Sequence, residues 1–337
     1  MRTRIAINGF GRIGRNAFKI AFDRDDIEIV AINDLTDTKT LAHLLKFDTN
    51  YGIYQHEVSY GENEIIVDGH HIVVLAERDP AALPWGAHQI DVVIESTGLF
   101  TDPKKAHAHI HPAGAKRVVI SAPAHGAGAT TIVLGVNEEE FKEHPKILDN
   151  ASCTTNSLAP VAEIVEEKFG IEKALMSTIH SYTQDQRLQD APHKDLRRAR
   201  AAAENIVPTT TGAAIAAALT VPALQGKFNG LSFRVPTSVV SMSDITFLLK
   251  KEVTEDQVND VFRAAAKEPR YQGILAVSEE ELVSKDFLGN SHSAIVDLPL
   301  TMVVGGNMLK VIAWYDNEWG YSNRLVEMTA DAGRGLA

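Results

Sequence analysis

The chain is 337 residues long, more than one hydrophobic core usually organises, so two domains are expected. Its 45% hydrophobic and 23% charged residues are typical of a soluble globular protein. A net charge of -11 argues against nucleic acid as a main partner, and no apolar run approaches the roughly 20 residues of a membrane span. The single cysteine excludes an intramolecular disulfide and favours a reducing, cytoplasmic compartment. No Cys/His cluster has metal-ligand spacing.

A glycine-rich turn is predicted between a strand and a helix at the start of the chain. Residues 4–8 have the pattern of a buried strand, Gly-Phe-Gly-Arg-Ile-Gly follows at 9–14, and a helix is expected over 15–23. A second strand over 27–32 is followed by Asp34, about 20 residues past the last glycine, where a carboxylate can bind ribose hydroxyls. These features favour a dinucleotide site over a simple turn with a helix-capping aspartate.

Strand-like and helical runs alternate through the rest of the first half. The expected strands are 64–67 and 71–75, as a hairpin, then 91–95, 116–121 and 130–135, with a helix over 102–113. This alternation favours a largely parallel sheet that binds the dinucleotide at the carboxyl ends of its strands. Ser121 lies at such an end, and it is a candidate cofactor contact or an ordinary turn residue.

The only cysteine lies at a predicted strand-to-helix turn. An apolar strand over 146–148 precedes it and an amphipathic helix follows. Unpaired N–H groups and the positive end of the helix dipole stabilise a thiolate at such a place. Cys153 is therefore interpreted as a nucleophile of low pKa rather than an inert thiol. The hydroxyls of Ser152 and Thr154 are expected to cap the helix or bind an anion.

The second half carries a histidine and a concentration of basic residues. A predicted strand over 173–180 ends at His180, which is either a partner of Cys153 or a structural histidine. The polar segment 181–205 is rich in arginine and lysine, which suggests a phosphate site or a subunit contact.

Further hydroxyls and one isolated arginine indicate anion binding. Pro-Thr-Thr-Thr-Gly at 208–212 precedes an alanine-rich helix and suggests either an anion pocket or simple capping. Arg234 lies in an otherwise apolar strand over 230–237 and is expected to face an anion. A mainly antiparallel sheet is predicted to continue with strands 241–249, 293–297 and 308–314, a helix over 254–267 opened by a capping box, and a final helix over 322–332.

Three motifs identify a family resemblance. They are Ile-Asn-Gly-Phe-Gly-Arg-Ile-Gly-Arg at 7–15, Ala-Ser-Cys-Thr-Thr-Asn at 151–156, and Trp-Tyr-Asp-Asn-Glu-Trp-Gly-Tyr at 314–321. With them the chain resembles phosphorylating glyceraldehyde-3-phosphate dehydrogenase over essentially its whole length. The α/β fold that this implies has a Rossmann-type NAD-binding domain at 1–150, an α+β catalytic domain with a mainly antiparallel sheet at 151–317, and a C-terminal helix at 318–337 that packs back on the NAD-binding domain.

The resemblance also implies the site residues. Cys153 would be the nucleophile and His180 the base that activates it. The nicotinamide cofactor would be contacted by Gly9, Gly11, Arg12, Ile13, Gly14, Asp34, Arg78, Ser121 and Asn317. The substrate phosphate and the attacking inorganic phosphate would be held by Ser152, Thr154, Thr183, Arg198, Thr211, Gly212 and Arg234.

The implied reaction is the oxidative phosphorylation of glyceraldehyde 3-phosphate to 1,3-bisphosphoglycerate through a Cys153 hemithioacetal and thioester, in glycolysis or gluconeogenesis. The implied assembly is a cytoplasmic homotetramer, with segment 181–205 against the neighbouring subunit's cofactor site. Asp34 favours NAD because a carboxylate repels a 2′-phosphate. Ala191 stands where NAD-specific members usually have leucine and resembles the NADP pattern, so NAD with some use of NADP is expected.

Two other functions fit parts of the sequence. One is that of the close relative acting on erythrose 4-phosphate, although the threonine run at 209–211 and Leu35-Thr36 look more like the glyceraldehyde enzyme. The other is a catalytically silent NAD-binding or redox-sensing protein with Cys153 as an oxidisable thiol. The presence of His180 and of the arginines 198 and 234 argues against that primary role.

Overall fold

The computed structural model describes residues 2–335, which fall into two compact units. The first unit comprises residues 2–132, Glu138–Ala151 and 322–335, and the second comprises Val133–Asn137 and Ser152–Tyr321. Helices and sheets with parallel and antiparallel strands occur together, as the predicted α/β class requires. Over the described range, no helix is long and apolar enough to cross a membrane.

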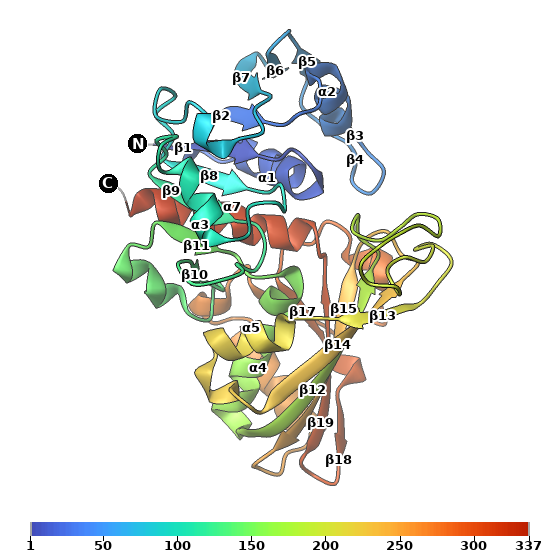
Figure 1. Ribbon diagram of the computed structural model, residues 1–337. Coiled ribbons are helices and arrows are strands. Elements are labelled where there is room, and N and C mark those ends of the chain that lie inside the picture. Colours follow the sequence, from blue (N-terminus) through green and yellow to red (C-terminus); the bar gives the residue numbers. More distant parts are fainter. Residues whose placement is uncertain (1, 336–337) are drawn as a thin grey trace. The chain divides into compact units, whose positions relative to one another are not determined.

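Nine strands form the sheet of the first unit, in the order β10-β11-β9-β8-β1-β2-β7-β6-β5 (Figure 1). Neighbours from β10 to β7 run parallel, and β6 and β5 are added antiparallel, so both the parallel sheet and the hairpin were predicted correctly. The strands are β1 Thr3–Asn8, β2 Ile27–Asn33, β5 Val58–Tyr60, β6 Glu64–Val67, β7 His70–Leu75, β8 Val92–Glu95, β9 Arg117–Ile120, β10 Thr130–Thr131 and β11 Ile147–Asp149. The strand order reverses at β1, the place where open sheets of this kind bind ligands.

The longest helices of this unit lie near the N-terminus and near the C-terminus of the chain. They are α1 Arg12–Phe22, α2 Thr38–Lys46, α3 Pro103–Ala106 and the part of α7 (Trp319–Arg334) from residue 322 on, with 3-10 turns at Pro80–Ala82, His107–His109 and Glu138–Glu143. A small hairpin pairs β3 (Phe47–Asp48) with β4 (Gly52–Ile53).

Two predicted elements of the first half are shorter than expected. The helix predicted over 102–113 stops after α3 and one 3-10 turn, because Pro112 cannot continue a helix and disfavours helical backbone in the residue before it. The strand predicted over 130–135 ends at Thr131. Its continuation turns instead, with the Asn137 side chain accepting the Val133 N–H at 2.8 Å.

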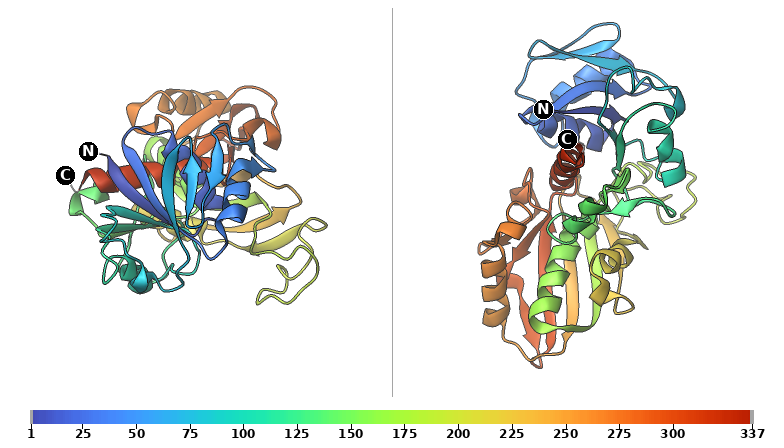
Figure 2. Two further views of the ribbon diagram at one scale, coloured as in Figure 1. Left: turned by 90° about the horizontal axis from the view of Figure 1, so that it is seen from above. Right: turned by 90° about the vertical axis from the view of Figure 1, so that its left-hand side faces the viewer.

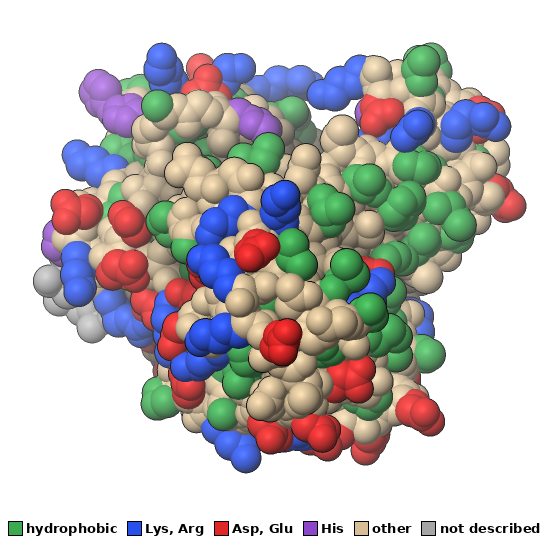
Figure 3. Space-filling model, turned by 90° about the horizontal axis from the view of Figure 1, so that it is seen from below, with side chains coloured by type: hydrophobic (Ala, Val, Ile, Leu, Met, Phe, Trp, Pro, Cys, Tyr) green, Lys and Arg blue, Asp and Glu red, His purple; other side chains and the backbone are tan. Residues whose placement is uncertain are grey.

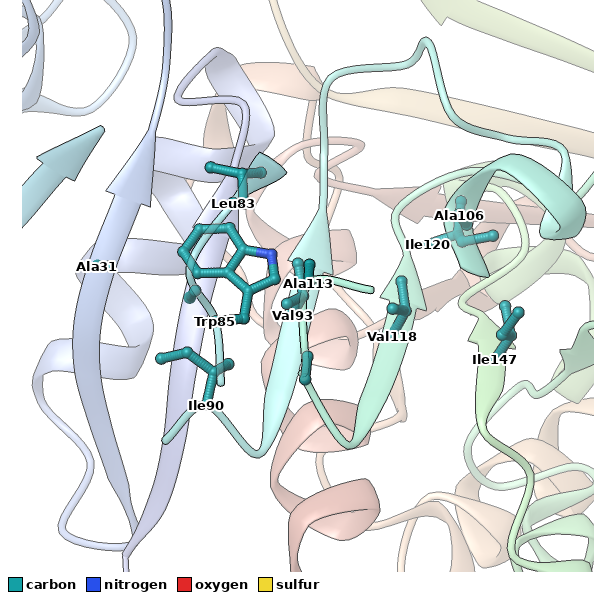
Figure 4. Close-up of a cluster of buried hydrophobic side chains, with 12 residues drawn as sticks. Ala31, Leu83, Trp85, Ile90, Val93, Ala106, Ala113, Val118, Ile120 and Ile147 are labelled. Atoms are coloured by element: carbon teal, nitrogen blue, oxygen red, sulfur yellow. The ribbon is translucent and has the colours of Figure 1, made fainter. Parts of the chain in front are cut away.

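A buried polar network supports the carboxyl ends of the central strands. Trp85 lies in the hydrophobic cluster that packs on the sheet (Figure 4), and its indole N–H donates to His109 Nδ1 at 3.0 Å. The opposite ring nitrogen therefore carries the proton and donates to the Glu95 carboxylate at 3.0 Å. Glu95 also accepts from the Asn8 amide at 2.5 Å, which joins the ends of β1 and β8 beneath the glycine-rich turn.

Arg117 closes the last turn of α7 within the first unit. Its guanidinium is buried and donates to the main-chain oxygens of Ala332 and, at 3.1 Å, Gly335. We expect Arg117→Leu to lower the free energy of unfolding by about 2 kcal/mol, because terminal helix carbonyls lose a charged donor. Urea unfolding followed by circular dichroism measures the change. Lys116→Ala removes an exposed ion pair with Asp91 and should cost less than about 0.5 kcal/mol; equal losses for both variants would contradict the capping role.

The second unit is a sheet with helices on one face. Its strands follow the order β13-β14-β12-β15-β19-β17-β16, with β18 beside β19, and most neighbours are antiparallel as predicted. The strands are β12 Ile171–Ser181, β13 Val207–Thr210, β14 Phe228–Val235, β15 Ser241–Leu249, β16 Leu275–Ser278, β17 Ala294–Asp297, β18 Met302–Val304 and β19 Met308–Tyr315. Strands β13, β16 and β18 were not predicted.

Three helices cover the same face of this sheet, as Figures 1 and 2 show. They are α4 Cys153–Phe169, α5 Ala213–Thr220 and α6 Glu255–Ala265, and short 3-10 turns occur at Pro222–Leu224, Pro269–Tyr271, Ser284–Phe287 and Leu298–Leu300. The predicted capping box of α6 is confirmed. The Thr254 hydroxyl accepts the Gln257 N–H at 3.3 Å, and the Gln257 side chain accepts the Thr254 N–H at 2.9 Å.

Candidate active site

Cys153 is the first residue of α4, at the strand-to-helix turn that the sequence predicted. Ser152 is the N-cap, and its hydroxyl accepts the Thr155 N–H at 3.0 Å. Before this cap, Ala151 has a positive φ of 51° and donates its N–H to the Asp149 carboxylate at 2.9 Å. A cap and an aspartate-stabilised turn thus fix the backbone on both sides of residue 152.

His180 reaches Cys153 from the end of β12. The distance between Cys153 Sγ and His180 Nε2 is 3.4 Å, so the partnership that the sequence left open does form. His180 Nδ1 lies 2.7 Å from the carbonyl oxygen of Ser181. An Arg234 guanidinium nitrogen lies 2.9 Å from the same Nδ1. A carbonyl oxygen only accepts and a guanidinium only donates, so the two contacts favour opposite tautomers of the ring. The shorter contact, to the Ser181 carbonyl, places the proton on Nδ1 and leaves Nε2 facing the sulfur with a lone pair.

Burial sets the protonation of this pair. It raises the pKa of the Cys153 thiol, against the opposing effects of the Arg234 charge and of hydrogen bonds from Thr154. Burial and the charge of Arg234 lower the pKa of His180 to about 3. The low pKa expected for Cys153 is therefore contradicted, because the desolvation of the buried thiol has a larger effect than the Arg234 charge and the hydrogen bonds. A thiol next to a neutral imidazole is the resting arrangement.

Arg234 places a cation beside the imidazole. It lies on β14, which runs parallel to β12 with Arg234 directly opposite His180. One guanidinium nitrogen donates to the Ser181 carbonyl and to the Thr183 hydroxyl, each at 3.2 Å. Its Nε is buried and has no partner within residues 2–335, so the side chain keeps a donor for a ligand. Burial lowers the pKa of Arg234, and the nearby Asp185 carboxylate opposes that effect.

Arg198 joins the same set of side chains through Asp185, which sequence reasoning missed. Arg198 pairs with the Asp185 carboxylate at 2.5 Å and donates to the Thr209 hydroxyl at 2.9 Å. Asp185 also accepts the hydroxyl proton of Thr183. The desolvation of Asp185 is outweighed by these hydrogen bonds and by both arginines, so its pKa is lowered. Asp185 precedes every arginine of segment 181–205, so no sequence signal distinguished it from the other aspartates there.

Three other predicted anion contacts, Thr154, Thr211 and Gly212, form no hydrogen bond with Arg198 or Arg234 among the described residues. The Thr154 hydroxyl lies 2.9 Å from that of Tyr315, a buried tyrosine that sequence reasoning did not single out. Thr211 accepts the Ala213 N–H at 3.1 Å, and Gly212 is the N-cap of α5 without a side-chain cap. The structure shows no hydrogen bond from Thr211 or Gly212 to either arginine within residues 2–335.

The glycine-rich turn leaves room for a ligand at the start of α1. A Cβ atom at Gly9 or Gly14 would come within 2.6 Å of Thr97 N and 2.1 Å of Gly9 O respectively, so the fold itself requires both glycines. A Cβ at Gly11 would meet nothing within 4 Å. Gly11 is the N-cap of α1 and makes no side-chain cap, so open space lies at a helix N-terminus, which fits a pyrophosphate.

The remaining candidate cofactor contacts come from several segments of the chain. Asp34, past the end of β2, accepts the N–H groups of Phe10 at 2.8 Å and Thr36 at 3.0 Å. Arg12 pairs with Asp48 at 2.5 Å. Ile13 is half-buried in α1, Arg78 is exposed after β7, Ser121 follows β9, and Asn317 belongs to the second unit. No group of His, Cys, Asp and Glu side chains within residues 2–335 is arranged to hold a metal ion.

The features found in each unit by itself are those of one class of enzyme. A dinucleotide-binding sheet, a thiol beside a neutral imidazole and two adjacent arginines are the parts of a cofactor-dependent oxidoreductase that attacks an anionic substrate through cysteine. Residues 3–103 match the family model for the NAD binding domain of glyceraldehyde 3-phosphate dehydrogenase, and residues 152–317 match that for its C-terminal domain.

Similar proteins cover nearly the whole chain. The glyceraldehyde-3-phosphate dehydrogenase 1 of Bacillus cereus is 56% identical over 330 residues, 97% of this chain and 98% of its own. The glyceraldehyde-3-phosphate dehydrogenase of Geobacillus stearothermophilus is 54% identical over 98% of both chains, and that of Streptomyces coelicolor is 54% identical over 100% of both. The chain belongs to the glyceraldehyde-3-phosphate dehydrogenase family.

Family membership confirms the predicted activity and cofactor. The protein is an NAD-dependent oxidoreductase, and its reaction is the oxidative phosphorylation of glyceraldehyde 3-phosphate to 1,3-bisphosphoglycerate. None of the relatives named above is an erythrose 4-phosphate enzyme.

Proposed function

We propose that Cys153 is the nucleophile of this reaction and His180 its acid and base. The observation that carries the proposal is the 3.4 Å contact between Sγ and Nε2. Nε2 takes the thiol proton while Sγ attacks the aldehyde carbon, and it returns that proton to the aldehyde oxygen to complete the hemithioacetal. This transfer needs the tautomer with the proton on Nδ1, which the 2.7 Å contact of that atom with the Ser181 carbonyl supports.

His180 acts again in the oxidation and in product formation. NAD, when bound, supplies the hydride acceptor. As the carbon of the hemithioacetal is oxidised, Nε2 accepts the hydroxyl proton and a thioester remains on Cys153. Inorganic phosphate then attacks the thioester carbon, the C–S bond breaks, and the imidazolium returns its proton to the departing sulfur. The acyl phosphate leaves and the resting thiol is restored.

The two arginines are proposed to hold the substrate phosphate and the attacking phosphate. Arg234 lies next to the imidazole and has an unpartnered, buried Nε, while Arg198 is anchored on the other side of Asp185. Arg198 also pairs with the Asp195 carboxylate at 3.5 Å, so the observation that supports anion binding is the buried, unpartnered Nε–H of Arg234, a charged donor. The full proposed set of phosphate ligands is Ser152, Thr154, Thr183, Arg198, Thr211, Gly212 and Arg234.

NAD is proposed to bind at the glycine-rich turn. The pyrophosphate would lie over Gly11 at the start of α1, with Asp34 at the adenosine ribose. The other proposed contacts are Gly9, Arg12, Ile13, Gly14, Arg78, Ser121 and Asn317. Some use of NADP is also proposed, because Ala191 resembles the NADP-using pattern. Comparing kcat/KM for NAD and NADP tests it; undetectable turnover with NADP would rule it out.

We further propose a cytoplasmic homotetramer whose chains divide into the domains predicted from the sequence. The face of the second-unit sheet opposite its helices carries exposed apolar side chains, including Leu175, Leu231 and Met308. A space-filling view shows hydrophobic side chains gathered toward one side of the surface (Figure 3). Apolar area of this kind is typical of subunit contacts. Light scattering should give four subunits per particle, and cell fractionation tests the compartment.

Phosphate dependence tests the mechanism directly. We expect sustained reduction of NAD by the protein and glyceraldehyde 3-phosphate only when inorganic phosphate is present, measured by absorbance of the reduced cofactor. Without phosphate, the thioester on Cys153 should accumulate after about one turnover per active site. Comparable sustained turnover without phosphate would mean that water resolves the thioester, and the proposed site for the attacking inorganic phosphate would fail.

A further inference from the structure

A strained turn lies at the start of β15, beside the end of β12. Val240 has a φ of +72° and is almost completely buried. A left-handed backbone is rare for a β-branched residue, because its Cβ substituents crowd the carbonyl oxygens. Strain of this kind persists where surrounding contacts hold it, and such places concentrate at functional sites. Hydrogen bonds around Val240 are therefore expected to hold this turn in place and to have a function.

At this turn, hydrogen bonds of serine hydroxyls take the place of the main-chain hydrogen bonds between β12 and β15. The pairing of β12 with β15 ends at Ile179 opposite Met242. One step further, the Ser181 N–H donates to the Ser241 hydroxyl at 3.1 Å, and the Ser181 hydroxyl donates to the Val240 carbonyl at 2.8 Å. The left-handed turn thus brings the Ser241 side chain, rather than main chain, to the peptide that follows His180.

The second contact of Ser241 is to a proposed cofactor ligand. Its hydroxyl donates to Asn317 Oδ1 at 2.9 Å, and both side chains are buried. A hydroxyl has one proton and can accept through its lone pairs, so Ser241 satisfies Ser181 and Asn317 at once. Asn317 Nδ2 makes no hydrogen bond within residues 2–335. An amide whose oxygen is occupied in this way presents its N–H groups to a ligand.

We propose that Ser241 is a positioning residue for NAD. Its hydroxyl, anchored on the Ser181 N–H, holds the Asn317 amide so that Nδ2 is the donor available to the carboxamide oxygen of the nicotinamide. The inference rests on the proposed contact of Asn317 with NAD. Without the Ser241 hydroxyl, the Asn317 oxygen and the Ser181 N–H are left unsatisfied in a buried place, and the amide is no longer held in one orientation.

Ser243 provides a matched control for Ser241. It lies two residues along β15 on the same face, is equally buried, and its hydroxyl has no hydrogen-bond partner among the described residues. In the full-length protein, Ser241→Ala should raise the Kd for NAD about tenfold, measured by quenching of tryptophan fluorescence. Ser243→Ala should change it less than twofold. Alkylation of Cys153 by iodoacetamide without cofactor should stay within twofold of the wild-type rate, because Cys153 and His180 contact each other directly.

A double-mutant cycle tests the role of Ser241 separately from the proposed contact between Asn317 and NAD. If Ser241 acts through Asn317, the variant carrying Ser241→Ala and Asn317→Ala should bind NAD no more weakly than Asn317→Ala alone. Additive losses, or an unchanged Kd for Ser241→Ala when Asn317→Ala weakens binding, would overturn the positioning role. An unchanged Kd for Asn317→Ala would instead remove the proposed contact of Asn317. If Ser241→Ala does not fold, Ser241→Cys, with its weaker donor, should show the same pattern at smaller size.

Discussion

Cys153→Ser is expected to lower kcat at least about 10,000-fold while the Kd for NAD stays within twofold of wild type. A serine hydroxyl is a far weaker nucleophile, and Nε2 of His180 cannot remove its proton as readily as that of a thiol. The proposed cofactor contacts do not include residue 153, so NAD binding should not follow the loss of activity. Steady-state kinetics and fluorescence titration of the same preparation measure the two quantities.

The control for this variant lies one helical turn further along α4. Ser157 is fully buried, and its hydroxyl has no hydrogen-bond partner within residues 2–335. Ser157→Ala should keep kcat within a factor of about two, because it alters the same helix and removes no hydrogen bond made by Cys153 or His180. Turnover of Cys153→Ser at a rate near wild type would show that the reaction does not pass through a thioester at this residue.

Local patterns predicted the parts of the site that depend on neighbouring residues in the chain. The spacing of apolar residues placed Cys153 at the start of a helix and His180 at the end of a strand, and both positions are confirmed. The glycine-rich turn could also be predicted from the sequence, because close main-chain packing requires glycine at 9 and 14. These features follow from backbone geometry over a few residues.

The chemistry of the site depends on contacts that no local pattern carries. His180 stands beside Arg234 because β12 and β14 pair in parallel with one particular register, between segments 54 residues apart. Asp185 pairs with Arg198 because the loop after β12 folds back on itself, and no sequence pattern indicates that fold. The pKa of Cys153 was misjudged for the same reason, since desolvation depends on every group packed around the thiol.

His180→Asn is expected to lower kcat by about 100- to 10,000-fold, the range for loss of a positioned acid-base group. Asparagine can still contact the sulfur but cannot accept its proton. Alkylation of Cys153 by iodoacetamide near neutral pH should therefore slow as well. The wild-type imidazole is neutral there, because burial and Arg234 lower its pKa to about 3, and so it is ready to take the thiol proton. NAD affinity should not change.

The comparison of two rates tests whether His180 activates the thiol or only shapes the site. Loss of a base slows alkylation of the cofactor-free protein, whereas a change confined to substrate positioning would spare it. His193→Asn serves as the control, because His193 hydrogen-bonds locally to Asp195 and not to Cys153. Wild-type alkylation rates in His180→Asn, together with a large fall in kcat, would restrict His180 to the oxidation step. A fall in both rates would show that the reaction starts with transfer of the buried thiol proton to the neutral imidazole of His180.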